Sequence, residues 1–260
     1  MIAVVITTYA EDAEVTKCID AILKQTVFKQ LKIVVINNNS CFDTFQHIAP
    51  YVKHGIDAIG LPQNIGRIRA PDLAFRYLEL QDKYSHFVSI DADMLVEPDT
   101  LEKLRILMSA NPVIGLLSPM YIRGTDHNNI LEDAIFIKGK AKEIPSLIPN
   151  FMRMTPRVVE ACFMVSRACY KAFQIKHQGI FMTTVSTPYS LAGGQGNDFM
   201  RHLKPMGFQF GYHKDAFVQA IKNSCDTGGP NGYLAWKRKH RANRGAVTAP
   251  VPIGEGFYDA

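Results

Sequence analysis

Two aspartates one residue apart, Asp91 and Asp93, follow directly on the apolar run of residues 87–90. The run is short and rich in β-forming residues, which predicts a buried strand. Because side chains alternate along a strand, two acids at this spacing are expected to point the same way. Like charges this close repel each other unless a cation lies between them. The pair therefore predicts a divalent-cation site at the carboxyl edge of a sheet, with two solvated loop acids as the alternative.

The segments around this pair alternate between predicted strands and predicted helices. Strands are expected at residues 2–7, 31–36, 58–61 and 87–90, and helices at 12–24, 44–52, 69–81 and 100–109, the last with Asp99 as its N-cap. This alternation predicts a mostly parallel sheet with helices on both faces. Ligands of such sheets bind beyond the carboxyl ends of the strands. The polar turns at residues 7–9, 37–40 and 91–93 all fall there, so together they predict one binding cleft.

Beyond residue 112 the pattern is less regular. Strands are expected at residues 113–119, 135–138, 158–165 and 208–212, a short helix at 197–205, and loops at 139–156 and 179–196. No internal repeat is present, so one domain with a less regular second half fits best. A polar tail follows from about residue 221.

The composition excludes several classes of protein. The chain has 260 residues, of which 47% are hydrophobic and 20% are charged, as in an ordinary globular domain. It has no apolar stretch of the roughly 18–20 residues that a membrane-spanning helix requires, so no membrane span is expected. Five scattered cysteines without CxxC spacing argue against a zinc site and a disulfide framework. A reducing, cytoplasmic setting is expected.

The net charge of +5 is concentrated in one basic run between Lys237 and Arg241. Such a run is most often a solvated surface. It is also suited to binding phosphates, either of a small ligand or of a nucleic acid. Composition leaves these alternatives open.

Five segments match, in order, the motifs of one enzyme family. They are residues 4–9 (VVITTY), residues 34–40 (VVINNNS) with Asp43, Asn64-Ile65-Gly66 with Arg67, Asp91-Ala92-Asp93, and Gly196-Asn197-Asp198 with Arg201. In these segments the chain resembles family 2 of the nucleotide-sugar glycosyltransferases, which have the GT-A fold. The resemblance implies a single α/β, Rossmann-like GT-A domain at residues 1–220, with a nucleotide-sugar-binding half (1–110) and an acceptor half (111–220). Residues 221–260 then form a basic tail.

The resemblance also implies roles for individual residues. The nucleotide sugar is expected to contact Thr7, Thr8, Tyr9, Glu11, Asn37, Asn39, Asn64, Arg67, Asp91 and Ala92, with Lys237 and Arg241 of the tail closing over the diphosphate. Asp91 and Asp93 form the D-x-D pair that holds Mn²⁺ or Mg²⁺, and Asp198 is the general base. The family often has a histidine where Gln219 stands, so His213 is carried over as a substitute metal ligand. Asn37 replaces the usual base-contacting aspartate, and Asn197 replaces a glutamate.

The function implied is that of a metal-dependent, inverting hexosyltransferase or related transferase. It would move a sugar from a nucleotide diphosphate, with a UDP-sugar favoured, to a hydroxyl of a glycan, a lipid or modified nucleic acid. For Asp198 a helix N-cap is the alternative role. The alternative for the whole protein is a nucleic-acid-binding module that uses the basic run. A sugar transferase acting on modified DNA bases would combine both features.

Overall fold

The computed structural model describes residues 1–9, 12–38, 43–62, 65, 69–123, 126–130, 152–154, 161–176 and 202–221. Its strands are β1 (Ile2–Thr8), β2 (Leu31–Asn37), β3 (Asp57–Gly60), β4 (His86–Asp91), β5 (Met94–Val96), β6 (Ile114–Arg123), β7 (Asp126–Ile130), β8 (Met152–Met154), β9 (Cys162–Ser166) and β10 (Gln209–Ala220). Its α-helices are α1 (Asp12–Leu23), α2 (Asp43–Ile48), α3 (Arg69–Glu79), α4 (Thr100–Ala110) and α6 (Arg167–Lys176). Short 3₁₀ segments are η1 (Phe28–Gln30), η2 (Ala49–His54) and η4 (Lys204–Met206).

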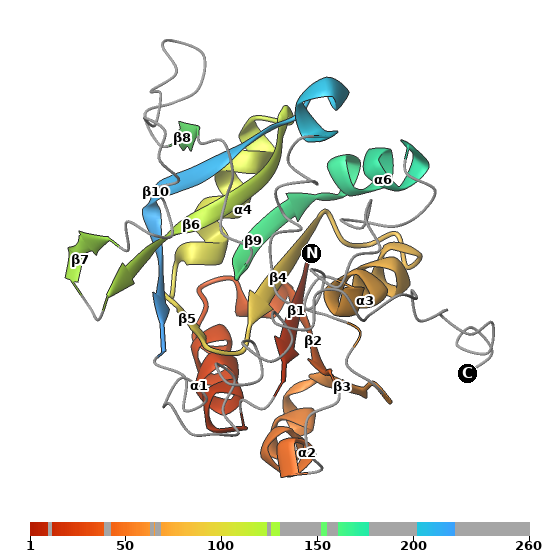
Figure 1. Cartoon of the computed structure of the whole chain (residues 1–260), viewed down its shortest axis with the longest axis vertical. Helices are drawn as coiled ribbons and strands as arrows, with labels where there is room; N and C mark the ends of the chain where they lie inside the picture. Colours follow the sequence, from red (N-terminus) through yellow and green to blue (C-terminus); the bar gives the residue numbers. More distant parts are fainter. Residues whose placement is uncertain are drawn as a thin grey trace, which may run out of the picture.

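The described strands form one sheet, in the order β3-β2-β1-β4-β9-β6-β10-β5, with β7 on β6 and β8 on β10. Helices flank it (Figure 1). The α/β single-sheet prediction is therefore confirmed.

The first four strands, β3, β2, β1 and β4, are all parallel to their neighbours. Every residue of β1 is buried, and so are the last five of β2 and the first five of β4. Continuous apolar runs of this kind are typical of strands covered on both faces, since neither side faces water. This parallel block is the part of the fold that the sequence pattern describes best.

The second half of the sheet is mixed. β9 is antiparallel to both β4 and β6, β10 is parallel to β6, and β5 and β8 are antiparallel to β10. β10 has twelve residues, whereas a strand of five was expected, and it bends partway along its length (Figure 1). The three-residue strand β5 and the helix α6 were not predicted.

Other expectations need local corrections. The helix expected at residues 44–52 is α-helical only to Ile48 and continues as the 3₁₀ segment η2, whose first turn contains Pro50. Asp99 precedes α4, but its side chain does not cap the helix; instead it forms an ion pair with Lys103, at 2.8 Å. The strand expected at 135–138, the loop at 179–196 and most of the helix at 197–205 lie outside the described residues. So does the loop expected at 139–156, except for Met152–Met154, which form the strand β8 and so correct that expectation. Among the helices that are described, none is both long enough and apolar enough to cross a membrane.

Candidate active site

The carboxyl ends of three parallel strands meet at one edge of the sheet, as predicted. In the strand register Thr8 lies opposite Asn37, Thr7 lies opposite Asp91, and Asn37 lies opposite Gly60. We call Thr7, Thr8, Asn37 and Asp91 the carboxyl edge. Regular strand pairing alone thereby brings together Thr7 and Asp91, which are 84 positions apart in the sequence.

Two hydroxyl groups at this edge lack hydrogen-bond partners within the part of the chain that the structure describes. Thr8 is fully buried and Thr7 is 7% exposed. Among the described residues neither Thr7 Oγ1 nor Thr8 Oγ1 has a hydrogen-bond partner, and the hydroxyl is the only polar group of each side chain. An unsatisfied buried hydroxyl costs roughly 1–3 kcal/mol. The edge therefore carries two buried polar groups that the described residues leave unsatisfied.

Asn38, the residue directly after β2, is hydrogen-bonded to two other segments. The Asn38 N–H donates to the carbonyl of Thr8 (2.9 Å), and Asn38 Oδ1 accepts the N–H of Ile65 (3.0 Å). Asn37 is 3% exposed, and its carbonyl accepts the N–H of Leu61 at 2.9 Å. Asn38 was not singled out from the sequence, although its place in a run of three asparagines directly after a predicted strand was the available signal.

The acid pair spans the end of a strand and a turn, which corrects the reasoning from strand alternation. β4 ends at Asp91, residues 92 and 93 form a turn, and β5 begins at Met94. The Asp91 N–H donates to Ala161 (2.8 Å) and the Ala92 N–H to Thr7 (3.1 Å). The carbonyl of Asp93 accepts the N–H of Ile221 at 2.7 Å. Asp91 and Asp93 are both half-buried, and these hydrogen bonds hold their backbone in place.

A layer of neutral groups lies behind Asp91. Burial, and then the negative charge of neighbouring groups that include Asp91, raises the pKa of the Tyr121 hydroxyl well above its ordinary value. Burial and the Asp91 charge likewise raise the pKa of the Cys162 thiol. Tyr121 Oη and Ser118 Oγ both donate to the carbonyl of Cys162, at 3.2 and 2.6 Å. These groups stay protonated and do not compensate the charge of Asp91.

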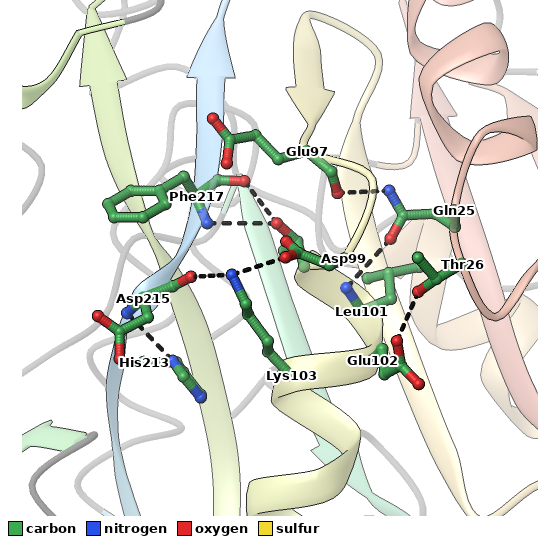
Figure 2. Close-up of polar contacts among 11 residues, drawn as sticks. Gln25, Thr26, Glu97, Asp99, Leu101, Glu102, Lys103, His213, Asp215 and Phe217 are labelled. Atoms are coloured by element: carbon green, nitrogen blue, oxygen red, sulfur yellow. Dashed lines mark hydrogen bonds and ion pairs between the residues drawn. The ribbon is translucent and has the colours of Figure 1, made fainter.

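The structure does not bring His213 to the acid pair. His213 lies opposite Pro119 of β6, whereas Gln219, which faces β5, lies opposite Ile122, three residues or about 10 Å further along β6. His213 is buried, and its Nδ1 accepts the N–H of Asp215 at 3.2 Å (Figure 2). Burial, partly opposed by the Asp215 charge, lowers the pKa of His213. Its position makes it part of the scaffold around β10 and not a third ligand beside Asp93.

Of the predicted metal ligands, Asp91 and Asp93 are neighbours along the chain, one at the end of β4 and the other in the turn that follows it. No group of three or more histidine, cysteine or acidic side chains gathers anywhere in the described ranges. A purely oxygen donor set fits a hard cation such as Mn²⁺ or Mg²⁺, which keeps open positions for water or phosphate oxygens. Tyr9 is half-buried beyond β1 and Ala92 is fully buried. The remaining predicted site residues, Glu11, Asn39, Asn64, Arg67, Asp198, Lys237 and Arg241, lie outside the described residues.

Solved structures with similar folds were found among sugar transferases. The mannosyltransferase PcManGT from Pyrobaculum calidifontis, in complex with GDP-Man and Mn²⁺, has 19% identity and a TM-score of 0.63, and the match covers 94% of this chain and 61% of that one. GalNAc-T7 with UDP, GalNAc and Mn²⁺ has 15% identity, a TM-score of 0.66, and coverages of 86% and 43%. TarS 1–349 from S. aureus with UDP-GlcNAc has 13% identity, a TM-score of 0.58, and coverages of 86% and 59%.

The chain spans 43–61% of the length of these three proteins. At such identities the likeness shows the fold, which is GT-A. No curated protein matches the chain in sequence. Residues 3–169, well over half of the 260, match the family model described as glycosyl transferase family 2. The chain therefore belongs to glycosyl transferase family 2.

Proposed function

We propose that this protein is a metal-dependent, inverting glycosyltransferase. It transfers a sugar from a nucleotide diphosphate, with UDP-sugars as the favoured class, to a hydroxyl group of an acceptor. Residues 1–110 bind the donor, residues 111–220 bind the acceptor, and residues 221–260 form a basic tail. Cys18, Cys162 and Cys169 are buried and form no disulfide among the described residues, which suits a reducing, cytoplasmic setting.

The observation that carries the proposal is the carboxyl edge. Three strand ends converge there, and two of the buried groups they supply, the hydroxyls of Thr7 and Thr8, have no partner among the described residues. Hydroxyl and amide groups at such an edge are suited to a nucleoside, because each donates and accepts hydrogen bonds. Asn37 would bind the base through its amide, and Asp91 would bind the ribose or a metal-bound water.

The acids at this edge would repel a diphosphate without a cation. When bound, Mn²⁺ or Mg²⁺ neutralises the negative charge that collects on the leaving diphosphate. Asp93, with Asp91 beside it, would hold this cation through carboxylate oxygens. The Ile221 N–H bonded to the Asp93 carbonyl puts the start of the tail beside the acid pair. This supports a role for Lys237 and Arg241 as a cover over the diphosphate.

In the transfer step the acceptor oxygen forms a bond to the anomeric carbon as the bond to the diphosphate breaks. Attack from the face opposite the leaving group inverts the anomeric centre. The proton of the acceptor hydroxyl passes to the carboxylate of Asp198, which acts as general base. Residues 139–156 and 179–195 are the segments that we assign to acceptor choice.

A second candidate is a nucleic-acid-binding module based on the basic run between Lys237 and Arg241. It would account for the run but not for acids at the sheet edge, which repel phosphates in the absence of a metal. Binding of DNA that weakens steeply with added salt, without any binding of nucleotides, would support this candidate.

The test of the proposal is the rate at which the protein releases nucleoside diphosphate from each of a panel of nucleotide sugars, with Mn²⁺ present. This release is expected to be slow. The wild type is expected to release the nucleoside diphosphate of only one kind of nucleotide sugar in the panel. Asp198→Asn should release the same nucleoside diphosphate at least about 100-fold more slowly. The matched control Asp57→Asn removes a carboxylate that is 48% exposed and paired with Lys32 at the opposite end of β3. It should behave like the wild type. No release from any nucleotide sugar, or equal rates in wild type and Asp198→Asn, would contradict the proposal.

A further inference from the structure

The strand β10 contains a bulge near its middle. His213 lies opposite Pro119 of β6, while Phe217 lies opposite the next residue, Met120. Residues 214–216 are therefore extra in β10, and we call them the β10 bulge. A bulge shifts the register of everything that follows it. The residues that follow here, Val218–Ala220, pair with β5.

One fully buried threonine secures the residue at the end of the bulge. Thr100 Oγ1 donates to the carbonyl of Phe217 (2.8 Å) and accepts the N–H of Phe217 (3.2 Å). The Glu97 N–H donates to the same carbonyl at 3.2 Å. Lys103 adds a contact within the bulge, because its Nζ donates to the carbonyl of Asp215 at 2.6 Å while pairing with Asp99 (Figure 2).

The segment that carries Thr100 is itself fixed from the other side. We call residues 96–101 the β5–α4 corner. Gln25, which is 3% exposed, donates through Nε2 to the carbonyl of Glu97 (2.6 Å) and accepts the N–H of Leu101 through Oε1 (3.1 Å). The Thr26 N–H donates to the carbonyl of Pro98 at 2.8 Å. The corner is thus held between the end of α1 and β10 (Figure 2).

The contacts of the β5–α4 corner and the β10 bulge bear on the backbone of Asp93, which directly precedes β5. β5 starts at the residue after Asp93, and β10 pairs with β5 through Val218, Gln219 and Ala220. One residue further on, the Ile221 N–H bonds to the Asp93 carbonyl at 2.7 Å. A slip of β10 after the bulge would break this bond and turn the last residues of β10 to the opposite face. The position of the Asp93 backbone therefore depends on the register set at Phe217.

We propose that Thr100 is a positioning residue for Asp93: through Phe217 it fixes the register of the end of β10 and so the placement of the Asp93 carboxylate toward a divalent cation. This inference rests on the proposed role of Asp93 in metal binding. Residues behind a ligand commonly change metal affinity by about 10–100-fold when they are altered. The Thr100 hydroxyl is engaged by the backbone of Phe217, so metal-independent nucleotide binding is expected to be unaffected by its loss.

The test is calorimetric titration of UDP and GDP at several Mn²⁺ concentrations, together with thermal unfolding. In Thr100→Val the Mn²⁺ concentration for half-maximal enhancement of nucleotide binding is expected to rise about 10-fold. Thr100→Ser keeps the hydroxyl and should restore the wild-type value. The matched control is Thr26→Val, which removes an exposed hydroxyl bonded to Glu102 (2.8 Å) at the outer side of the same corner. It should leave the Mn²⁺ requirement unchanged.

An unchanged Mn²⁺ requirement in Thr100→Val, with only the melting temperature lowered, would overturn the inference. If Thr100→Val does not fold, Lys103→Met decides, because it removes only the contact to Asp215 and the ion pair. A rise in the Mn²⁺ requirement supports the inference and an unchanged value overturns it. Failure of the proposed function is distinguishable, since the wild type itself would then show no nucleotide binding that Mn²⁺ enhances.

Discussion

Thr8 and Thr100 are both fully buried threonines, yet their hydroxyl groups are in opposite situations. At the carboxyl edge, Thr8 Oγ1 has no partner among the described residues. At the β5–α4 corner, Thr100 Oγ1 both donates and accepts, and Gln25 beside it does the same. A buried polar group that is satisfied within the chain holds the scaffold together. One that the described residues leave unsatisfied, such as the Thr8 hydroxyl, is where we expect a ligand to bind.

The opposite end of β4 offers the largest effect on stability. His86 opens this strand at the amino edge, 5% exposed, with its Nδ1 2.9 Å from Ser85 Oγ. Burial, followed by the charges of Arg105 and the N-terminus, lowers the pKa of His86 to about 4. The native state thus holds this ring neutral, whereas the unfolded chain protonates it below its ordinary pKa of about 6.5.

The contribution of His86 to the free energy of unfolding is accordingly fully present above pH 6.5, and it is lost as the pH falls toward 4. The free energy of unfolding should fall by at most about 3 kcal/mol over this interval because of His86. Urea unfolding of wild type and His86→Gln across the interval isolates this part. Equal pH slopes in the two proteins would contradict it. Nucleotide affinity should not follow the titration of His86, because the ring lies at the edge away from Asp91.

The two threonines give the sharpest test of the comparison itself. Thr100→Val removes two buried hydrogen bonds and should lower the free energy of unfolding by about 2 kcal/mol. Thr8→Val removes a hydroxyl that has no partner in the described ranges. It should raise the free energy of unfolding by about 1 kcal/mol and weaken nucleotide binding about 5-fold. Urea denaturation and calorimetric titration measure both quantities. A loss of stability in Thr8→Val as large as in Thr100→Val would show that the Thr8 hydroxyl is satisfied within the chain and would remove the contrast.

The parallel block could be predicted well from the sequence because each of its strands is identified by its own short run of residues. β1, β2 and β4 are unbroken apolar runs closed by polar turns, so their ends and their shared edge follow from the pattern. The helix α6 also carried a local signal, in buried Cys169, Tyr170 and Phe173 at helical spacing. It was missed because the predicted elements were less regular beyond residue 112.

The orientation of the acid pair was not predictable in the same way. The argument from strand alternation assumed that the strand continues through Asp93, but β4 ends at Asp91 and residues 92–93 turn toward β5. β5 has three residues, and it pairs with a strand more than 120 positions later in the chain. The contact between Thr100 and Phe217 spans 117 positions and ends at a bulge. No periodicity in the sequence encodes such a contact. His213 was carried over from the family resemblance as a substitute for a histidine at Gln219, but the register places it opposite Pro119, three residues before the partner of Gln219.

The central claim is that the acids at the carboxyl edge bind a nucleoside diphosphate through a divalent cation. The most direct measurement is titration of UDP and GDP into wild type, Asp93→Ala and the control Asp57→Asn, each with and without Mn²⁺. The account predicts that Mn²⁺ strengthens binding of one nucleotide in the wild type and in Asp57→Asn, and has no effect in Asp93→Ala. An equal effect of Mn²⁺ in Asp93→Ala, or no binding of any nucleotide by the wild type, would contradict it.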